Sequence, residues 1–386
     1  MPHKISVIVC GMNSGVEDTI TNQQKERKYM PSLDGLRGLA CLMVVFSHAC
    51  RIDGLGLEGF AGPVSYIIGC LGVILFFALS GFLMSTLYLD RVFSMDNAIR
   101  FTAARAARIA PAYYAAVTFV LLLTLTVLPD YMPEMDGVMA IRSYLFVGSA
   151  GFFWSIPPEV QFYGFFLLIW GAFYLFKGGR RSCLYAVLFV CAAMIATRDH
   201  WGGILLPSKL HIFLAGVLAA YLLRYARMGV LFSRTPVQIF AVFAAIAYGV
   251  WFSASLLTWR MADLLAANPL YSDIPLSIVI AAGIMALSHS TSFTKVLEMR
   301  GMRLLGSASF SIYLFHEPLL RLMEGRLILP EQMLAVNAAL AVIVAVGAPV
   351  LFYLFCEKTM NEKARMACLS AIFNVRERFL SRKKAA

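Results

Sequence analysis

Residues 29–50 read YMPSLDGLRGLACLMVVFSHAC, and this stretch decides the fold. Ser32 and Asp34 are available to cap the start of a helix that is otherwise apolar except at Arg37 and His48. At about 100° and about 1.5 Å per residue, Arg37 and His48 share one face, about 16 Å apart along the axis. Asp34 can reach Arg37 on that face. Charged residues in a membrane helix are costly and indicate function; the alternative is a snorkelling Arg and a structural His.

The composition indicates a membrane protein. The chain has 386 residues, of which 60% are hydrophobic and only 14% charged, with a mean hydropathy of +0.74. A soluble protein carries about 25% charged residues, so that class is excluded. The apolar run 5–12 is too short for a signal peptide, and we expect a cytosolic N-terminal tail. The eight cysteines lack CxxC or CxxH spacing, so we expect neither disulfides nor a metal site.

The apolar runs predict an all-α, polytopic membrane protein with about ten transmembrane helices. We place the spans at 34–50, 66–89, 110–128, 158–176, 183–197, 207–224, 237–257, 273–289, 304–320 and 333–356.

The charge distribution orients these spans. With both termini in the cytosol, 25 of the 33 Lys and Arg residues fall in cytosolic segments, and each internal cytosolic loop carries at least three. We therefore divide the chain into a cytosolic tail (1–31), a transmembrane domain (32–358) and a basic cytosolic tail (359–386) that lies on the inner leaflet. The net charge of +11 reflects this topology, and we expect no nucleic-acid partner.

Two motifs lie on or beside the second and third spans. Ser80 and Gly81 interrupt the second span with small residues, which either pack closely against another helix or widen a tunnel. Arg105 and Arg108 are neighbours on a helix that enters the third span from the cytosol. An Arg pair suits a nucleotide phosphate, although it is also an ordinary cytosolic anchor.

The remaining polar motifs lie towards the outer side. Trp154, Ser155 and Glu159 stand where the fourth span begins, and the carboxylate falls in the first turn of that helix. Glu159 and His48 come to a similar depth and could form a base and its orienter; otherwise Glu159 is a capping residue beside interfacial aromatic rings. His316 near the end of the ninth span is a second outer histidine, either structural or catalytic.

Glu357 ends the tenth span on the cytosolic side, where we expect it to pair with a basic residue. The chain has no GxSxG, no P-loop and no GxGxxG after a strand, which argues against ATP-driven transport by this chain alone.

Taken together, the motifs resemble the acyltransferase-3 family of integral-membrane O-acyltransferases. The resemblance covers residues 29–358 and rests on seven features in family order, which are LDGLRG at 33–38, the Arg37-x10-His48 pair, FFALSGFL at 76–83, RAARIAPAY at 105–113, WSIPPEVQFY at 154–163, the segment from Gly306 through Tyr313 and His316 to Pro318, and Glu357. It departs from the family pattern at Pro157–Pro158 and at Val160, where a second carboxylate is usual.

The resemblance implies transfer of an acyl group, usually acetyl, from cytosolic acyl-CoA to a hydroxyl of an extracytoplasmic glycan such as O-antigen, exopolysaccharide or peptidoglycan. Some relatives acylate small molecules such as macrolides. Others carry a hydrolase-like domain after the last span, which we do not expect in this chain because it ends too soon. The implied location is the cytoplasmic (inner) membrane of a bacterium, with acyl-CoA and a glycan or lipid-linked glycan as partners and no bound cofactor.

We therefore expect two sets of site residues. Arg37, His48 and Glu159 are the predicted catalytic residues. The predicted substrate-binding residues are Asp34, Ser80, Gly81, Arg105, Arg108, Trp154, Ser155, Tyr313 and His316. The rival hypothesis is a transporter for a small acid that uses Arg37 and His48 as relay groups, but repeated halves and paired broken helices are not evident in the sequence.

Overall fold

The structure is a computed structural model that describes residues 29–226, 228–324 and 326–370, and in these ranges it contains helices and no strand. This confirms the all-α fold class for the described part of the chain. The principal helices are α2 (Pro31–Ala49), α3 (Pro63–Tyr88), α4 (Met95–Thr126), α6 (Ile156–Lys177), α7 (Arg181–Ala196), α8 (Leu210–Tyr225), α10 (Thr235–Leu256), α13 (Ile274–Leu287), α14 (Arg300–Ser307), α15 (Ser309–Met323) and the continuous run of α16 (Leu334–Val342), η7 (Ile343–Gly347), α17 (Ala348–Phe352) and η8 (Tyr353–Glu357).

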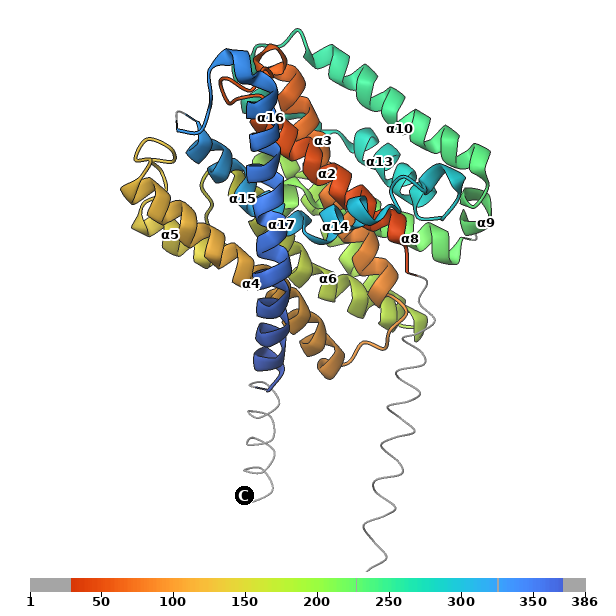
Figure 1. The fold of residues 1–386 in the computed structure, drawn as a ribbon. Coiled ribbons are helices and arrows are strands. Elements are labelled where there is room, and N and C mark those ends of the chain that lie inside the picture. Colours follow the sequence, from red (N-terminus) through yellow and green to blue (C-terminus); the bar gives the residue numbers. More distant parts are fainter. Residues whose placement is uncertain (1–28, 227, 325, 371–386) are drawn as a thin grey trace, which may run out of the picture.

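Short elements connect the principal helices (Figure 1). They are η1 (Glu58–Phe60), α5 (Gly137–Tyr144), η2 (Gly151–Ser155), η3 (Arg198–His200), η4 (Leu206–Ser208), α9 (Met228–Phe232), α11 (Met261–Ala267), α12 (Pro269–Ser272), η5 (Ser292–Thr294) and η6 (Glu331–Met333).

Five helical stretches of the described chain are long and apolar enough to cross a membrane. They are Pro63–Tyr88, Met95–Thr126, Gly151–Lys177, Thr235–Leu256 and Leu334–Ser370, and a sixth is Met261–Ser272 with Ile274–Leu287 if this pair, bent by 56°, counts as one span. The protein is thus a multi-pass membrane protein. The other expected spans also fall on helices, but α7 and α8 are only 16 residues long, so the number ten stays a prediction.

The start of α2 differs from the expectation. The helix begins at Pro31 without a side-chain cap, so the predicted capping roles of Ser32 and Asp34 are wrong. The Ser32 hydroxyl instead donates to the carbonyl of Leu287 at 2.5 Å, which ties α2 to the end of α13. Asp34 accepts a hydrogen bond from the hydroxyl of Tyr29 and forms no ion pair with Arg37. The Arg37 guanidinium is therefore left without this partner.

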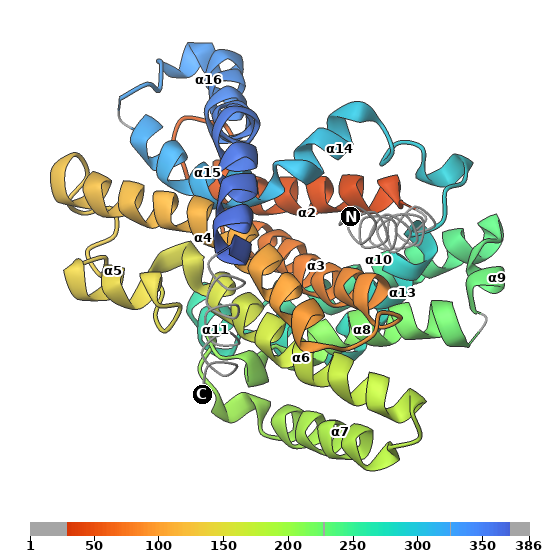
Figure 2. The same cartoon turned by 90° about the horizontal axis from the view of Figure 1, so that it is seen from below.

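The glycines of the LDGLRG motif allow a very close contact between α2 and the segment that includes α14, which lies beside it in Figure 2. A Cβ added to Gly35 would lie 1.9 Å from the carbonyl oxygen of Leu297, and one added to Gly38 would lie 2.7 Å from that of Met302. The contact is reciprocal, because a Cβ on Gly306 would lie 1.7 Å from the carbonyl oxygen of Asp34. This backbone-to-backbone packing fixes the position of α2, and Arg37 lies inside the motif that makes it.

Helix α3 runs through the middle of the bundle and contacts α2, α8, α13 and α6 (Figure 2). Gly81 lies against α8, because a Cβ there would come 2.0 Å from the carbonyl oxygen of Phe213, and Gly216 of α8 approaches Ala78 in the same way at 1.9 Å. Gly81 therefore serves helix packing, one of the two roles expected for it, while its substrate-binding role stays a prediction.

Three boundaries differ from the predicted spans. Arg105 and Arg108 lie on the helix that enters the third span, as predicted, but this helix, α4, starts at Met95, where Ser94 accepts a cap bond from the amide of Asn97. The ninth span is divided at Ala308 between α14 and α15. The last helix continues without a break to Ser370, beyond the predicted boundary at 358. Residues 1–28 and 371–386 of the predicted tails lie outside the described residues.

Candidate active site

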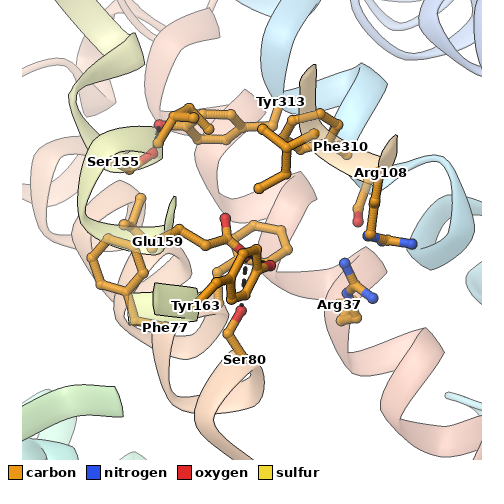
Figure 3. A pocket seen from close by; sticks show the side chains of 14 residues that line it. Arg37, Phe77, Ser80, Arg108, Ser155, Glu159, Tyr163, Phe310 and Tyr313 are labelled. Atoms are coloured by element: carbon orange, nitrogen blue, oxygen red, sulfur yellow. Dashed lines mark hydrogen bonds between the residues drawn. The ribbon is translucent and has the colours of Figure 1, made fainter. Parts of the chain in front are cut away.

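A small cavity of about 40 Å³ lies within the bundle, between α2, α3, α4, α6 and α15. Aromatic and aliphatic side chains form much of its wall, and eight polar residues line it (Figure 3). These are Arg37, Ser80, Arg108, Ser155, Glu159, Tyr163, Ser309 and Tyr313. Six of the eight are predicted site residues from five different sequence motifs, so the fold brings together residues far apart in the chain.

One end of the cavity holds the carboxylate of Glu159. Its Oε1 accepts hydrogen bonds from the hydroxyl of Ser80 at 3.1 Å and from that of Tyr163 at 2.5 Å, both visible in Figure 3. Tyr163 is one helical turn after Glu159 on α6, so the same helix supplies the acid and one of its donors. These two donors orient the carboxylate within the cavity.

The other end of the cavity holds two guanidinium groups. Arg37 of α2 and Arg108 of α4 extend towards each other in Figure 3. Within the described residues neither forms an ion pair or a hydrogen bond. Two like charges at one end of a cavity, with no carboxylate bonded to them, have the chemistry that suits an anion with several oxygens.

Glu357 interacts electrostatically with Arg108 and Arg37 but forms no ion pair with either of them. It is fully buried in η8 and accepts hydrogen bonds from Ser311 and from Asn361, the latter at 3.3 Å. The expectation that Glu357 pairs with a basic residue is therefore wrong. The carboxylate joins the last helix to α15 instead.

Ser155 and Tyr313 form a short hydrogen-bonded chain along one wall of the cavity. The hydroxyl of Ser155 donates to the hydroxyl of Tyr313 at 2.6 Å, and Tyr313 donates to the carbonyl of Phe152 at 2.7 Å. These bonds fasten η2 to α15. The loop before α6 is thereby held in place, with Glu159 one turn further along.

His48 and His316 lie near the cavity but do not line it. Their ring centres are 5.0 Å apart in an edge-to-face arrangement. The rings of Phe152 and Tyr313 lie 5.8 and 6.0 Å from that of His316, so these two aromatic residues connect the histidines to the cavity wall. Within the described residues no hydrogen bond joins His48 to Glu159, whose Oε1 bonds to Ser80 and Tyr163 instead.

The other predicted site residues surround the cavity without lining it. The Arg105 guanidinium carbon lies 5.9 Å from the centre of the Tyr163 ring, and its buried Nε has no hydrogen-bond partner among the residues that the structure describes. Trp154 packs edge-on against Phe77, a wall residue, at 6.2 Å. Asp34 and Gly81 lie away from it. Sequence reasoning gave no role to Tyr163, although its four-residue spacing from Glu159 was a usable signal.

A comparison with known families identifies the chain. Residues 30–354 match a family described as an acyltransferase domain, the acyltransferase-3 domain. The chain belongs to the acyltransferase-3 family. The match covers most of the chain and every residue that lines the cavity.

Curated relatives are similar to this chain over its membrane part. Peptidoglycan O-acetyltransferase OatA of Listeria monocytogenes is 25% identical over 334 residues, which cover 77% of this chain and 50% of the relative. O-acetyltransferase OatA of Staphylococcus aureus is 22% identical, covering 76% of this chain and 51% of the relative. The putative peptidoglycan O-acetyltransferase YrhL of Bacillus subtilis is 24% identical, covering 78% and 50%. The chain spans about half the length of these relatives. No solved structure matches the chain.

Proposed function

We propose that this protein is a membrane O-acyltransferase that moves an acyl group, most simply acetyl, from cytosolic acyl-CoA to a hydroxyl of an extracytoplasmic glycan. The observation that carries the proposal is the unpaired arginine pair, Arg37 and Arg108, in a cavity that also holds an oriented carboxylate. The pair suits the phosphates of CoA, and three bacterial relatives are named as peptidoglycan O-acetyltransferases or O-acetyltransferases.

The proposed topology gives each substrate its own side. In it ten helices span the cytoplasmic membrane of a bacterium and both termini are cytosolic, with the transmembrane domain at 32–358 between a tail at 1–31 and a basic tail at 359–386. The excess of Lys and Arg in alternate loops supports this orientation. Arg37 then lies towards the cytosol and His48 towards the outside, about 16 Å apart along α2.

The proposed reaction follows this separation. Arg37, Arg108 and the nearby Arg105 bind the CoA phosphates, and the acyl-pantetheine arm extends past Ser80 towards the outer side. His48 removes the proton of the acceptor hydroxyl as its oxygen bonds to the acyl carbon; the carbon–sulfur bond then breaks and the thiolate takes up the proton. A base of this kind supplies roughly 10²–10⁴-fold in rate. Glu159 orients the substrate, and the hydrogen bonds of Ser155 and Tyr313 keep the cavity wall between η2 and α15 in place.

The test uses membranes that contain the protein, supplied with radiolabelled acetyl-CoA and with the host's surface polysaccharide. We expect label in the glycan with the native protein and none with His48→Ala at equal membrane abundance. An active His48→Ala variant would overturn the assignment of the base. If the native protein consumes no acyl-CoA, the transferase proposal itself fails.

A further inference from the structure

His316 has one ring nitrogen fully engaged. Its Nδ1 lies 2.8 Å from the carbonyl oxygen of Tyr313 and 3.0 Å from that of Ile312. A carbonyl oxygen can only accept a hydrogen bond, so Nδ1 must carry the proton. The second nitrogen, Nε2, of the neutral ring then has a lone pair and no proton. The backbone of α15 thus fixes the tautomer of this histidine.

The free nitrogen of His316 is buried and unsatisfied. The side chain is 0% exposed, and within the described residues Nε2 has no hydrogen-bond partner. A buried acceptor without a donor costs about 1–3 kcal/mol, so its retention needs an explanation. The fixed Nδ1 bonds also exclude a flipped ring, because a flip would place a carbon against the two carbonyls.

The tautomer of His48, unlike that of His316, is not fixed by a hydrogen bond. Within the described residues neither of its ring nitrogens has a hydrogen-bond partner, so nothing fixes its tautomer. It is only partly buried, and its ring centre is 5.0 Å from that of His316. A ring nitrogen lies about 1.2 Å from its ring centre, so a hydrogen bond of about 2.9 Å between two such rings separates their centres by about 5 Å.

The charged groups near His48 cannot take the orienting role. Arg51 and Arg321 are cations and do not accept a proton. Glu317 accepts a hydrogen bond from Tyr131 and lies 3.5 Å from Arg321, so its oxygens have other partners. Phe152, the other ring beside the two histidines, has no polar side-chain atom. Among these groups this leaves the unpartnered Nε2 of His316, whose ring centre is 5.0 Å from that of His48, as the candidate acceptor.

We propose that His316 is a positioning residue, whose Nε2, unpartnered in the structure, accepts an N–H hydrogen bond from His48 during the reaction and so directs the other nitrogen of His48 at the acceptor hydroxyl. This inference rests on the proposed transferase function. The proton of the hydroxyl passes to His48 and then to the departing thiolate, while His316 keeps its own proton on Nδ1 throughout. A neutral imidazole suits this buried place because an ionised carboxylate there has a large desolvation cost.

The two amide replacements of His316 separate positioning from structure. Gln places a hydrogen-bonding atom near the position of Nε2, and Asn places one near that of Nδ1. If His316 positions His48, His316→Gln keeps kcat within about tenfold of the native value, whereas His316→Asn and His316→Leu lower kcat by about 10²-fold with little change in KM for acetyl-CoA. A merely structural role reverses this order, because only Asn can bond to the α15 carbonyls.

The assay measures acetyl transfer from acetyl-CoA in membranes, with each variant at matched abundance and with His200→Gln, an exposed histidine, as the control. Full activity of His316→Asn, or equal losses in all three variants at unchanged thermal stability, would overturn the positioning role. The failure of the proposed function is a different result, in which the native protein transfers no acetyl group. The two failures therefore cannot be confused.

Discussion

At the scale of single residues, the arginine pair gives the sharpest prediction. A hydrogen bond to a charged group contributes about 1.5–3 kcal/mol, so loss of one guanidinium should weaken phosphate binding by tenfold or more. We expect Arg37→Ala and Arg108→Ala each to raise KM for acetyl-CoA by that factor. The KM of Arg37→Lys should lie between those of the native protein and Arg37→Ala, because lysine keeps the charge but lacks the planar guanidinium group. The measurement is the acetyl-CoA dependence of acetyl transfer.

The matched control for this prediction is Arg142→Ala, since Arg142 is an exposed arginine on α5 away from the cavity. It should leave KM unchanged. Equal effects of the cavity arginines and of Arg142 would show that general positive charge, and not this pair, attracts CoA.

The identity of the cavity residues could be predicted from the sequence better than their partners. Arg37, Arg108 and Glu159 stand in recognisable motifs, and all three line the cavity. Spacing along one helix does not say which neighbour a side chain meets, so the bonds of Glu159 to Ser80 and Tyr163 were missed. Adjacent residues on a helix point about 100° apart, which is why Ser80 faces the cavity while its neighbour packs against α8.

At the scale of elements, the contact between α2 and the α14 segment determines where Arg37 lies. A methyl group at Gly35 would overlap the carbonyl oxygen of Leu297 at 1.9 Å, and this backbone oxygen cannot move aside as a flexible side chain could. We expect Gly35→Ala to destabilise the protein by about 1–3 kcal/mol and to abolish most of its activity. Thermal unfolding in detergent and the transfer assay measure the two effects.

The control is Gly301→Ala on α14, where an added Cβ would meet nothing within 4 Å. This change should leave stability equal or raise it by about 0.5–1 kcal/mol, because alanine favours the helix. A harmless Gly35→Ala would mean that the two helices are not packed as closely as described.

A second prediction at this scale concerns the turn between α3 and α4. Asp90 accepts hydrogen bonds from Tyr225, from Lys177 at 3.2 Å and from Arg224 at 3.0 Å, and so joins this turn to α6 and α8. Burial alone raises the pKa of Asp90, but the bonds from Tyr225 and Lys177 and the charge of Arg224 outweigh it and hold the pKa below its ordinary value. The stabilisation is therefore complete above about pH 4 and is lost as the pH falls through the lowered pKa.

We expect Asp90→Asn to lower stability at pH 7 by no more than about 1 kcal/mol, since the ion pairs are partly exposed and screened. The difference between the variant and the native protein should shrink in acid, as the native carboxyl becomes protonated. Unfolding temperatures in detergent at pH 7 and pH 3.5 test this. A difference that is independent of pH would show that the charge of Asp90 contributes nothing.

The limits of element prediction have physical causes. The third span is predicted to start at residue 110, where the arginines end, yet the repeated alanines of residues 95–109 favour a helix and Ser94 caps it. Charge reports on which side of the membrane a segment lies and not on whether it is helical. The division of the ninth span at Ala308 does not follow from the sequence. It accompanies the packing of α14 against α2, and the hydropathy of residues 304–320 carries no information about that contact.

At the scale of the whole molecule, the proposed function needs access for CoA from the cytosol and for the glycan from the outside. Whether the short helices α7 and α8 cross the membrane decides this topology.

Cysteine substitutions at four exposed positions test the topology in a background without the eight native cysteines. The substitutions are Gly59→Cys, Arg180→Cys, Gly202→Cys and Ser292→Cys. With ten spans, a membrane-impermeant maleimide should label positions 59 and 202 in intact cells and positions 180 and 292 only after permeabilisation. If α7 and α8 did not cross, position 202 would label together with position 180. Then the loop that begins α8 would lie on the CoA side, and the path from Arg37 to an external glycan would need a different set of helices.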